Sequence, residues 1–220
     1  MDNSAELIRS FIIAYSLVAK KVAEKQINFI HIDFDHEQNS INKLKKGFQE
    51  FLANPSKDKL KNFWHKENLW SAIRSVTAEK LIEKSSLDNV AAIMHEINGA
   101  DQYNQDWEER LGAQSSLREF WGKIKGQPIE NGCADNALVF LGYPRPRNYT
   151  EFRNSYSNFR EKYQEALDNV QVTSYPIEIE IDQFFNFLDK TNDADLVDQK
   201  IAPLDKDLDP TFAVIPGGVI

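Results

Sequence analysis

Cysteine is nearly absent from this sequence of 220 residues, which contains only Cys133. A single thiol cannot form an internal disulfide, and it cannot supply the several thiolates of a cysteine-rich zinc site. A chain without disulfides fits a reducing compartment, so we expect a cytoplasmic protein. Folding does not require such cross-links, because 41% of the residues are hydrophobic and 11% are aromatic, as in ordinary globular proteins.

A long hydrophobic run is also missing near the start of the chain. Residues 11–19 are apolar, but a membrane span needs about 20 such residues. A signal peptide begins with positive charge and ends with small residues, whereas Asp2 and Glu6 precede this run and Lys20 and Lys21 follow it. We therefore expect neither a signal peptide nor contact with a membrane.

Established catalytic motifs are absent as well. The sequence contains no GxSxG nucleophile motif, no P-loop, no GxGxxG dinucleotide motif and no HExxH zinc motif. These absences remove the strongest sequence indicators of acyl transfer and nucleotide binding. They favour a protein that is not an enzyme, and no catalytic residue is predicted.

Helical periodicity runs through most of the chain. Apolar residues recur at spacings of three and four, and proline or glycine ends several of the resulting stripes. Ser56 is expected to cap the helix that follows Pro55, and Ser116 with Glu119 forms the pattern of a capping box. We therefore predict a mainly α, multi-helix domain over residues 1–170. Its predicted apolar stripes lie at 7–22, 41–52, 60–64, 69–81, 90–97, 103–111, 117–124, 134–141 and 152–170.

The period changes from 3.6 to 2 beyond residue 170. Ile177, Ile179 and Ile181 alternate with acidic residues, which is typical of a strand with one buried face. Residues 27–34 form a second alternating stretch, and we expect the two to pair in a minor two-strand β element, because an isolated strand leaves its backbone unpaired. Residues 171–220 are therefore predicted to form an acidic C-terminal appendage with a short strand, a short helix and an Asp-rich irregular tail.

Charge is distributed unevenly along the chain. Residues 1–167 contain 23 Asp and Glu against 23 Lys and Arg, whereas residues 168–220 contain 11 against 3, which accounts for the net charge of −8. The acidic appendage has two interpretations. It is either a solvated linker or a surface that docks on a basic patch, in this chain or in a partner.

Potential metal ligands are densest in residues 31–37. If residues 27–35 form a strand, His31, Asp33 and Asp35 lie on one face and His36 follows directly. Imidazole and carboxylate groups together suit Zn²⁺, Mn²⁺ or Fe²⁺. The alternative is a polar strand end in which Asp35 caps the following helix. No cofactor is predicted, and a divalent metal ion at these four residues is left open.

Two basic regions could bind a partner. Residues 43–66 contain seven lysines and have a net charge of +5. Residues 143–163 place arginines among tyrosines and phenylalanines, a combination that suits phosphate contact and base stacking. Helical spacing also suits these aromatic residues to a core, so a solvated helix face is the alternative for both regions. The candidate binding residues are Lys43, Lys45, Lys46, Lys57, Lys59, Lys61, Arg145, Arg147, Arg153 and Arg160.

These observations together predict a non-catalytic helical accessory or adaptor subunit that acts through protein–protein contacts. Its expected partner is a larger protein or a second copy of the chain in a homo-oligomer. Two alternatives are left open. One is a nucleic-acid-associated subunit that uses the Arg/aromatic and Lys-rich faces, and the other is a metal-dependent enzyme centred on residues 31–37.

Overall fold

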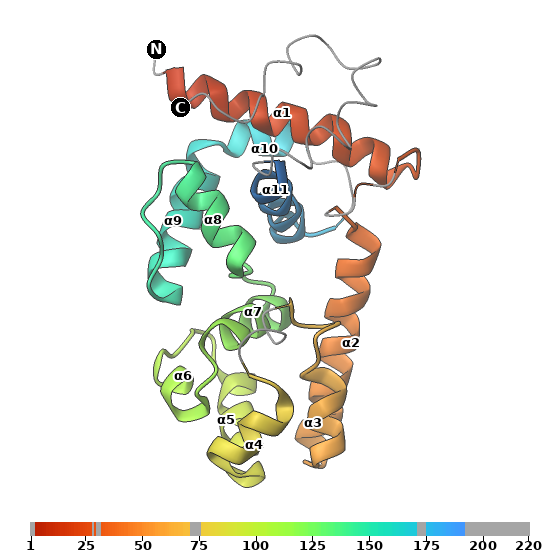
Figure 1. The fold of residues 1–220 in the computed structure, drawn as a ribbon, viewed down its shortest axis with the longest axis vertical. Coiled ribbons are helices and arrows are strands. Elements are labelled where there is room, and N and C mark those ends of the chain that lie inside the picture. Colours follow the sequence, from red (N-terminus) through yellow and green to blue (C-terminus); the bar gives the residue numbers. More distant parts are fainter. Residues whose placement is uncertain (1–2, 28, 30–31, 71–75, 171–174, 192–220) are drawn as a thin grey trace. The chain divides into compact units, whose positions relative to one another are not determined.

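The computed structural model describes residues 3–27, 29, 32–70, 76–170 and 175–191, and it confirms the mainly α class (Figure 1). Within these ranges, no helix combines the length and the hydropathy that a membrane span requires. The helices are α1 (Asn3–Ala23), α2 (Phe34–Ala53), α3 (Lys57–Phe63), α4 (Ala78–Ser85), α5 (Leu87–Gly99), α6 (Asp106–Leu111), α7 (Gln114–Lys125), α8 (Gly132–Phe140), α9 (Tyr149–Lys162), α10 (Gln164–Val170) and α11 (Ile177–Thr191).

Local signals in the sequence set several helix ends. The Ser56 side chain accepts a hydrogen bond from the Lys59 N–H at 3.3 Å, so the predicted cap of α3 is confirmed. Gly112 and Gly126 end α6 and α7 with φ of 60° and 62°. This left-handed conformation favours glycine, because a Cβ atom would meet the neighbouring carbonyl.

The predicted two-strand element is wrong for the residues that the structure describes. Residues 177–191 form α11, and among the described residues of 27–34 the structure has an isolated β bridge between Phe29 and Ile32 but no strand. The alternation at 177–181 gave a wrong prediction because Glu180 and Asp182, at 3% and 5% exposure, are buried along with Ile179 and Ile181. A helix that is buried on nearly all sides does not display a 3.6-residue polar pattern.

Two finer predictions also differ from the structure. The predicted capping box is wrong, since α7 begins at Gln114 and both Ser116 and Glu119 lie buried inside the helix. The long helix predicted over 152–170 is divided into α9 and α10, which meet at Tyr163. Capping-box residues and a continuing apolar stripe are local patterns, and neither one fixes where a helix ends when tertiary packing decides otherwise.

The chain divides into two compact units. The central unit comprises Asp35–Asp135 and Pro146–Asn154, and the terminal unit comprises Met1–Phe34, Asn136–Arg145 and Ser155–Ile220. The division passes through α8 and α9, whose first residues belong to the central unit. The predicted domain boundary at residue 170 stays a prediction, because residues 171–174 and 192–220 lie outside the described part of the chain.

The core of the central unit is largely aromatic. Phe120 of α7 lies 5.1 Å from Phe48 of α2, 5.8 Å from Phe63 of α3 and 5.3 Å from Trp64, measured between ring centroids. Gly47 lets α2 and α3 approach closely, because a Cβ atom at this position would lie 2.7 Å from the Phe63 Cβ. The apolar stripes predicted at 60–64 and 117–124 therefore contribute to one core.

The terminal unit packs α1 against α10 and α11 (Figure 1). Phe184 of α11 lies 5.4 Å from Tyr15 of α1 and 5.9 Å from Phe159 of α9 between ring centroids. The Tyr15 hydroxyl donates a hydrogen bond to the Glu180 carbonyl at 3.1 Å, so the polar end of this buried ring is satisfied. The apolar stripe predicted over 7–22 faces this core.

Candidate functional site

Helix α7 places two cations in the interior of the central unit. Arg118 is 7% exposed and Lys123 is 5% exposed, although long basic side chains are rarely buried unless they are paired. Each cation lies between two carboxylates that come from different helices or loops. The two groups are named below the Arg118 network and the Lys123 network.

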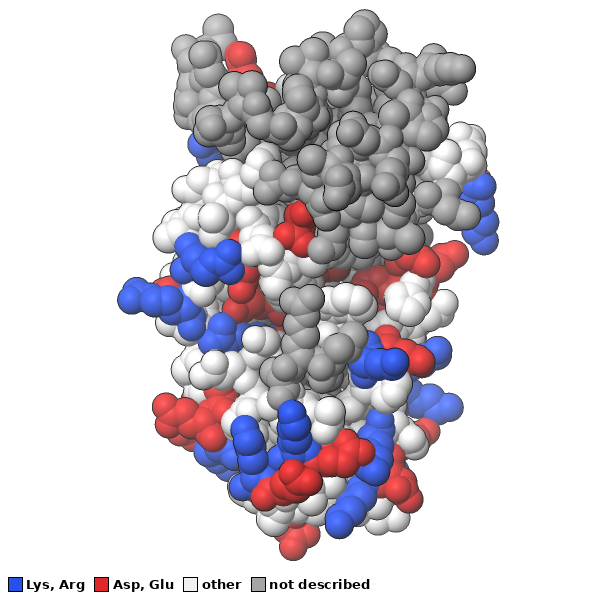
Figure 2. Space-filling view, viewed as in Figure 1, with Lys and Arg blue, Asp and Glu red and all other residues white. Residues whose placement is uncertain are grey.

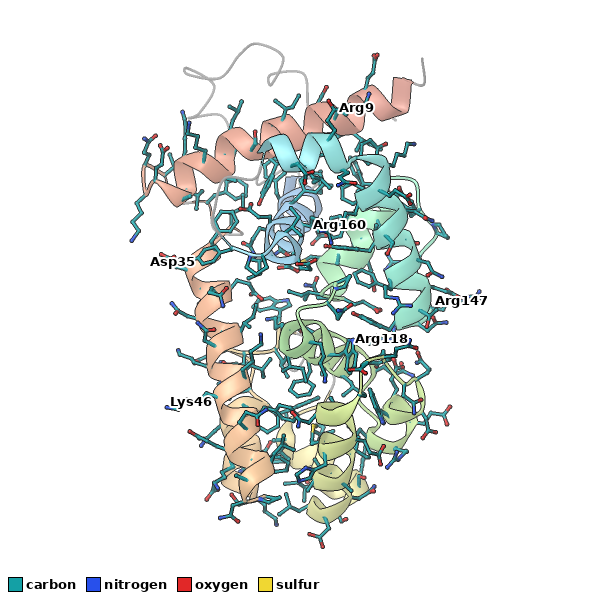
Figure 3. The ribbon with its side chains drawn as sticks, turned by 180° about the vertical axis from the view of Figure 1, so that it is seen from behind. Arg9, Asp35, Lys46, Arg118, Arg147 and Arg160 are labelled. Atoms are coloured by element: carbon teal, nitrogen blue, oxygen red, sulfur yellow. The ribbon has the colours of Figure 1, made fainter. Side chains whose placement is uncertain are left out.

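The Arg118 network joins four segments of the central unit (Figure 3). The guanidinium donates to both carboxylate oxygens of Glu108 of α6, at 2.6 and 3.0 Å, and to Oε1 of Glu130 at 2.6 Å. It also donates to the Arg147 carbonyl at 3.1 Å. The Tyr103 hydroxyl donates to Glu108 at 2.8 Å. Charge-assisted, two-pronged bonds of this kind fix both distance and orientation.

Close backbone packing brings Glu130 to the arginine. A Cβ atom at Gly122 of α7 would lie 2.7 Å from the Pro128 carbonyl oxygen and 2.9 Å from the Ile129 Cα, so only glycine fits this approach. The Tyr149 hydroxyl donates to the same Pro128 carbonyl at 2.8 Å. The segment before Glu130 is therefore held from two sides.

Glu130 is the titratable group of this network. Burial raises its pKa to about 7, Arg118 opposes that rise, and the charge of Asp135 adds to it. Its second carboxylate oxygen, Oε2, is buried and has no hydrogen-bond partner within the described residues. One guanidinium shared by two carboxylates leaves one negative charge uncompensated when both are ionised. Glu130 is therefore the group that takes up a proton near neutral pH.

The Lys123 network connects α7 to α2 and to the turn after α3. The ammonium lies 3.0 Å from Glu37 of α2 and 3.0 Å from Glu119, and it donates to the Asn68 carbonyl at 3.0 Å. The Asn68 side chain donates to the carbonyls of Asn62 and Phe63 at 3.2 and 3.1 Å. The turn at residues 65–69 is thus tied to two helices.

Trp70 follows this turn and is the most unusual residue of the central unit. Its backbone N–H donates to the buried Glu119 carboxylate at 2.9 Å, yet the residue is 62% exposed. The other three tryptophans, Trp64, Trp107 and Trp121, are 2 to 3% exposed. A large apolar side chain is therefore presented to solvent from a backbone position that buried groups hold in place.

The predicted lysine sites all lie on α2 and α3 of the central unit. Lys61 pairs with Glu79 at 3.0 Å, and its hydrogen bond lowers the pKa of Glu79 to about 2. Lys46 lies 4.0 Å from Glu50. Within the described residues, no ion pair involves the remaining four, which are Lys43, Lys45, Lys57 and Lys59. On the face seen in Figure 2, Lys and Arg of this unit lie among Asp and Glu.

The predicted arginine sites are divided between the two units. Arg147 and Arg153 belong to the central unit, whereas Arg145 and Arg160 belong to the terminal unit. Within the central unit, Lys46 and Arg147 lie on opposite sides (Figure 3). The aromatic residues expected to stack with bases are 0 to 3% exposed, except for the partly exposed Tyr143, so they belong to the cores. They are Tyr149, Phe152, Tyr156, Phe159 and Tyr163.

The structure tests the predicted metal ligands only in part. His31 lies outside the described residues. Asp35 and His36 lie on the first turn of α2, so Asp35 does not lie on a strand as expected. The Asp33 N–H donates to the Gln183 side chain at 2.9 Å. In the described ranges, no group of three or more His, Cys, Asp or Glu side chains could hold a metal ion, and the metal site stays a prediction.

Sequence reasoning missed Arg118, Lys123 and Trp70. The two cations lie next to the predicted stripe of α7, in positions that a surface helix would expose, and Trp70 fitted a predicted helical stripe. No local pattern distinguishes them, because their partners are distant in sequence. Comparisons with protein-family models, curated proteins and solved structures return no match to this chain. The proposals below therefore depend on its own residues.

Proposed function

We propose that this protein is a non-catalytic helical accessory or adaptor subunit that acts through protein–protein contacts, with Trp70 as the anchor of its binding surface. The exposure of Trp70, at 62%, is the observation that supports this proposal. Tryptophan is among the residues most enriched at the energetic centres of protein interfaces, because one side chain buries a large apolar area.

The backbone of Trp70 suits such a role because it is held before binding. Glu119 fixes the Trp70 N–H, and Lys123 fixes both Glu119 and the Asn68 carbonyl. On the other side of residues 71–75, the Val76 carbonyl accepts a hydrogen bond from the Trp64 ring N–H at 2.9 Å. An anchor on a fixed backbone loses less conformational entropy on binding, which strengthens the complex.

The chemistry of Trp70 defines its partner. An indole ring binds best in an apolar pocket that excludes water and offers an acceptor to the ring N–H. We expect that pocket on a larger protein. A second copy of this chain is the other candidate, and the mass of the assembly in solution distinguishes the two.

Quantitative affinity capture with the full chain tests the proposal. The wild type, Trp70→Ala and Val139→Ala are compared, since Val139 is also an exposed apolar residue, at 40%, but lies in the terminal unit. We expect one partner at a stoichiometric ratio with the wild type and with Val139→Ala. Its affinity for Trp70→Ala should fall about 30-fold, as is typical of a hot-spot tryptophan.

Two results would overturn this proposal. One is a wild-type chain that stays monomeric and retains no stoichiometric partner. The other is a partner that binds wild type and Trp70→Ala equally well. Thermal unfolding of both variants should match the wild type, because the substituted side chains are exposed.

The lysines of α2 and α3 support nucleic-acid association as a second candidate. Lys43 and Lys45 of α2 and Lys57 and Lys59 of α3 form no ion pair within the described chain, so their charge is available to phosphate groups. The buried aromatic residues do not support base stacking. We therefore propose backbone contact without sequence preference for this candidate.

Fluorescence anisotropy with duplex DNA at several salt concentrations tests the second candidate. Lys43→Glu/Lys45→Glu should weaken binding and reduce the salt slope by about two phosphate contacts. Lys80→Glu/Lys84→Glu on α4 changes the net charge equally and should retain the slope. No anisotropy change with the wild type at low salt would exclude this candidate.

A further inference from the structure

Helix α1 presents an apolar face to solvent in the terminal unit. Ile13 is 54% exposed and Leu17 is 41% exposed, while Tyr15 and Val18 on the opposite side are 1 to 2% exposed. Residues four apart lie on the same face of a helix, so Ile13 and Leu17 form one patch. Arg9, Ile13, Leu17, Lys20 and Lys21 are named here the α1 outer face (Figure 3 labels Arg9).

The two ends of this face differ in charge. At the Arg9 end lies an open pocket of about 480 Å³, lined by Arg9, residues 161–166 and Asp168. Three carboxylates, those of Glu161, Glu165 and Asp168, outnumber the two cations in its lining, Arg9 and Lys162. The other end has Lys20 and Lys21 in the last turn of α1, where the helix dipole also favours cations. An acidic ligand is therefore favoured at the Lys20 end.

We propose that the α1 outer face is the docking site of residues 192–220 of the same chain. That segment contains six Asp against two Lys, all before residue 210, and residues 212–220 have no charged side chain. The charge pattern predicts the orientation. Residues 193–209 lie over Lys20 and Lys21, and the apolar residues after Phe212 cover Ile13 and Leu17.

The segment begins within reach of this face. Helix α11 ends at Thr191 and packs against α1 in the same unit, with Tyr15 and Phe184 in ring contact. Arg9 and Lys20 are about 16 Å apart along the helix axis, at 1.5 Å per residue. A segment of 29 residues spans up to about 100 Å when extended, so its length does not limit the contact.

The size of the face favours a covalently joined occupant over a second molecule. Two half-exposed apolar side chains and a few exposed ion pairs bury far less than the roughly 800 Å² per partner of a stable interface. For a contact of this size we expect a dissociation constant of roughly millimolar order. A segment joined to the same chain has an effective concentration of that order, whereas a second copy at micromolar concentration would leave the face almost empty.

Digestion of the full chain by an endoproteinase that cleaves before Asp tests this inference. A docked segment resists cleavage within residues 193–209. We compare the wild type with Ile13→Ser/Leu17→Ser and with Val139→Ser, which changes an equally exposed apolar residue of the same unit. Ile13→Ser/Leu17→Ser should be cleaved about three to ten times faster than the wild type, because the docked fraction is lost. Val139→Ser should be cleaved at the rate of the wild type.

A second variant and the protein concentration complete the test. Lys20→Glu/Lys21→Glu should accelerate cleavage by itself, because it removes the complementary charge and leaves the apolar patch intact. Equal cleavage rates in the wild type and both double variants would overturn the inference. Protection that increases with protein concentration would also overturn it, since the occupant would then be a second copy.

Discussion

The Arg118 and Lys123 networks lie on the same helix and are built from the same kinds of group, but their surroundings differ. Both carboxylates of the Arg118 network are inaccessible, with Glu108 at 2% and Glu130 at 3% exposure. In the Lys123 network, Glu119 is 1% exposed, whereas the Glu37 side chain is 13% exposed. The carboxylates of the Arg118 network are therefore closed to solvent, whereas one carboxylate of the Lys123 network is partly exposed.

This difference separates two uses of a buried charge. The Arg118 network contains Glu130, whose pKa is raised to about 7, so the charge of this network depends on pH. The Lys123 network fixes part of the surface, because its buried Glu119 accepts a hydrogen bond from the backbone N–H of the exposed Trp70. Removing the cation of either network leaves buried carboxylates without a compensating charge. The resulting loss in the free energy of unfolding exceeds the net stability that the ion pair contributes.

The largest effect is expected from Arg118→Met. The substitution leaves Glu108 and Glu130 buried without their cation, so the free energy of unfolding should fall by about 4 kcal/mol. Arg110→Met is the matched control, since Arg110 pairs with Glu96 at 2.7 and 2.8 Å but is partly exposed. Arg110→Met should lower the free energy of unfolding by less than about 1 kcal/mol. Urea unfolding measures both, and equal losses would refute the distinction between closed and exposed pairs.

Lys123→Met should lower the free energy of unfolding by about 3 kcal/mol. This loss is smaller than that of Arg118→Met because solvent partly stabilises the Glu37 carboxylate. The substitution should also change the fluorescence of Trp70, since Glu119 no longer has its cation. Lys125→Met lies on the same helix, where its ammonium contacts the Asn98 carbonyl and the Trp121 ring near the surface. The control Lys125→Met should lower the free energy of unfolding by less than about 1 kcal/mol. A Lys123→Met protein with unchanged stability and emission would contradict the anchoring of Trp70.

Glu130→Gln is expected to remove a pH dependence. The pKa of Glu130 in the folded protein, about 7, lies above its ordinary value of 4.5, so the folded state binds the proton more tightly. Its stabilising contribution is complete below about pH 4.5 and is lost as pH rises through 7, by at most about 3 kcal/mol. Arg118, Glu108, Asp135 and Tyr149 face this group and stay unchanged in the variant.

Urea unfolding between pH 4.5 and 7.5 measures this dependence as the difference between wild type and Glu130→Gln. The difference isolates Glu130, because other carboxylates titrate alike in both proteins. Parallel stability curves across this range would show that Glu130 keeps its ordinary pKa.

The smallest effect is expected from Lys61→Met. The Lys61–Glu79 pair spans 3.0 Å, but its side chains are 48% and 52% exposed, so solvent screens it. The pKa of Glu79 is lowered to about 2, so the pair stabilises the fold above about pH 4.5 and loses this effect as pH falls. We expect a loss of about 0.5 kcal/mol or less at neutral pH. A loss comparable with that of Lys123→Met would show that exposure does not separate these pairs.

Local sequence patterns predicted much of the fold and little of the candidate site. The apolar stripes of α1 and α2, the Ser56 cap and the glycine ends of α6 and α7 depend on residues within a few positions of one another. Trp70 and Glu119 are 49 residues apart, and Lys123 and Asn68 are 55 apart, so no local period relates them.

The sequence by itself determined the helical class, the concentration of negative charge beyond residue 167 and the concentration of lysines in residues 43–66, because side-chain spacing and ionisation are local properties. Only the tertiary structure decided that residues 177–191 are helical and that Arg118 and Lys123 are buried. It also decided that one tryptophan of four is exposed. Burial and pairing depend on which distant segments pack together, and that choice is made by the whole chain.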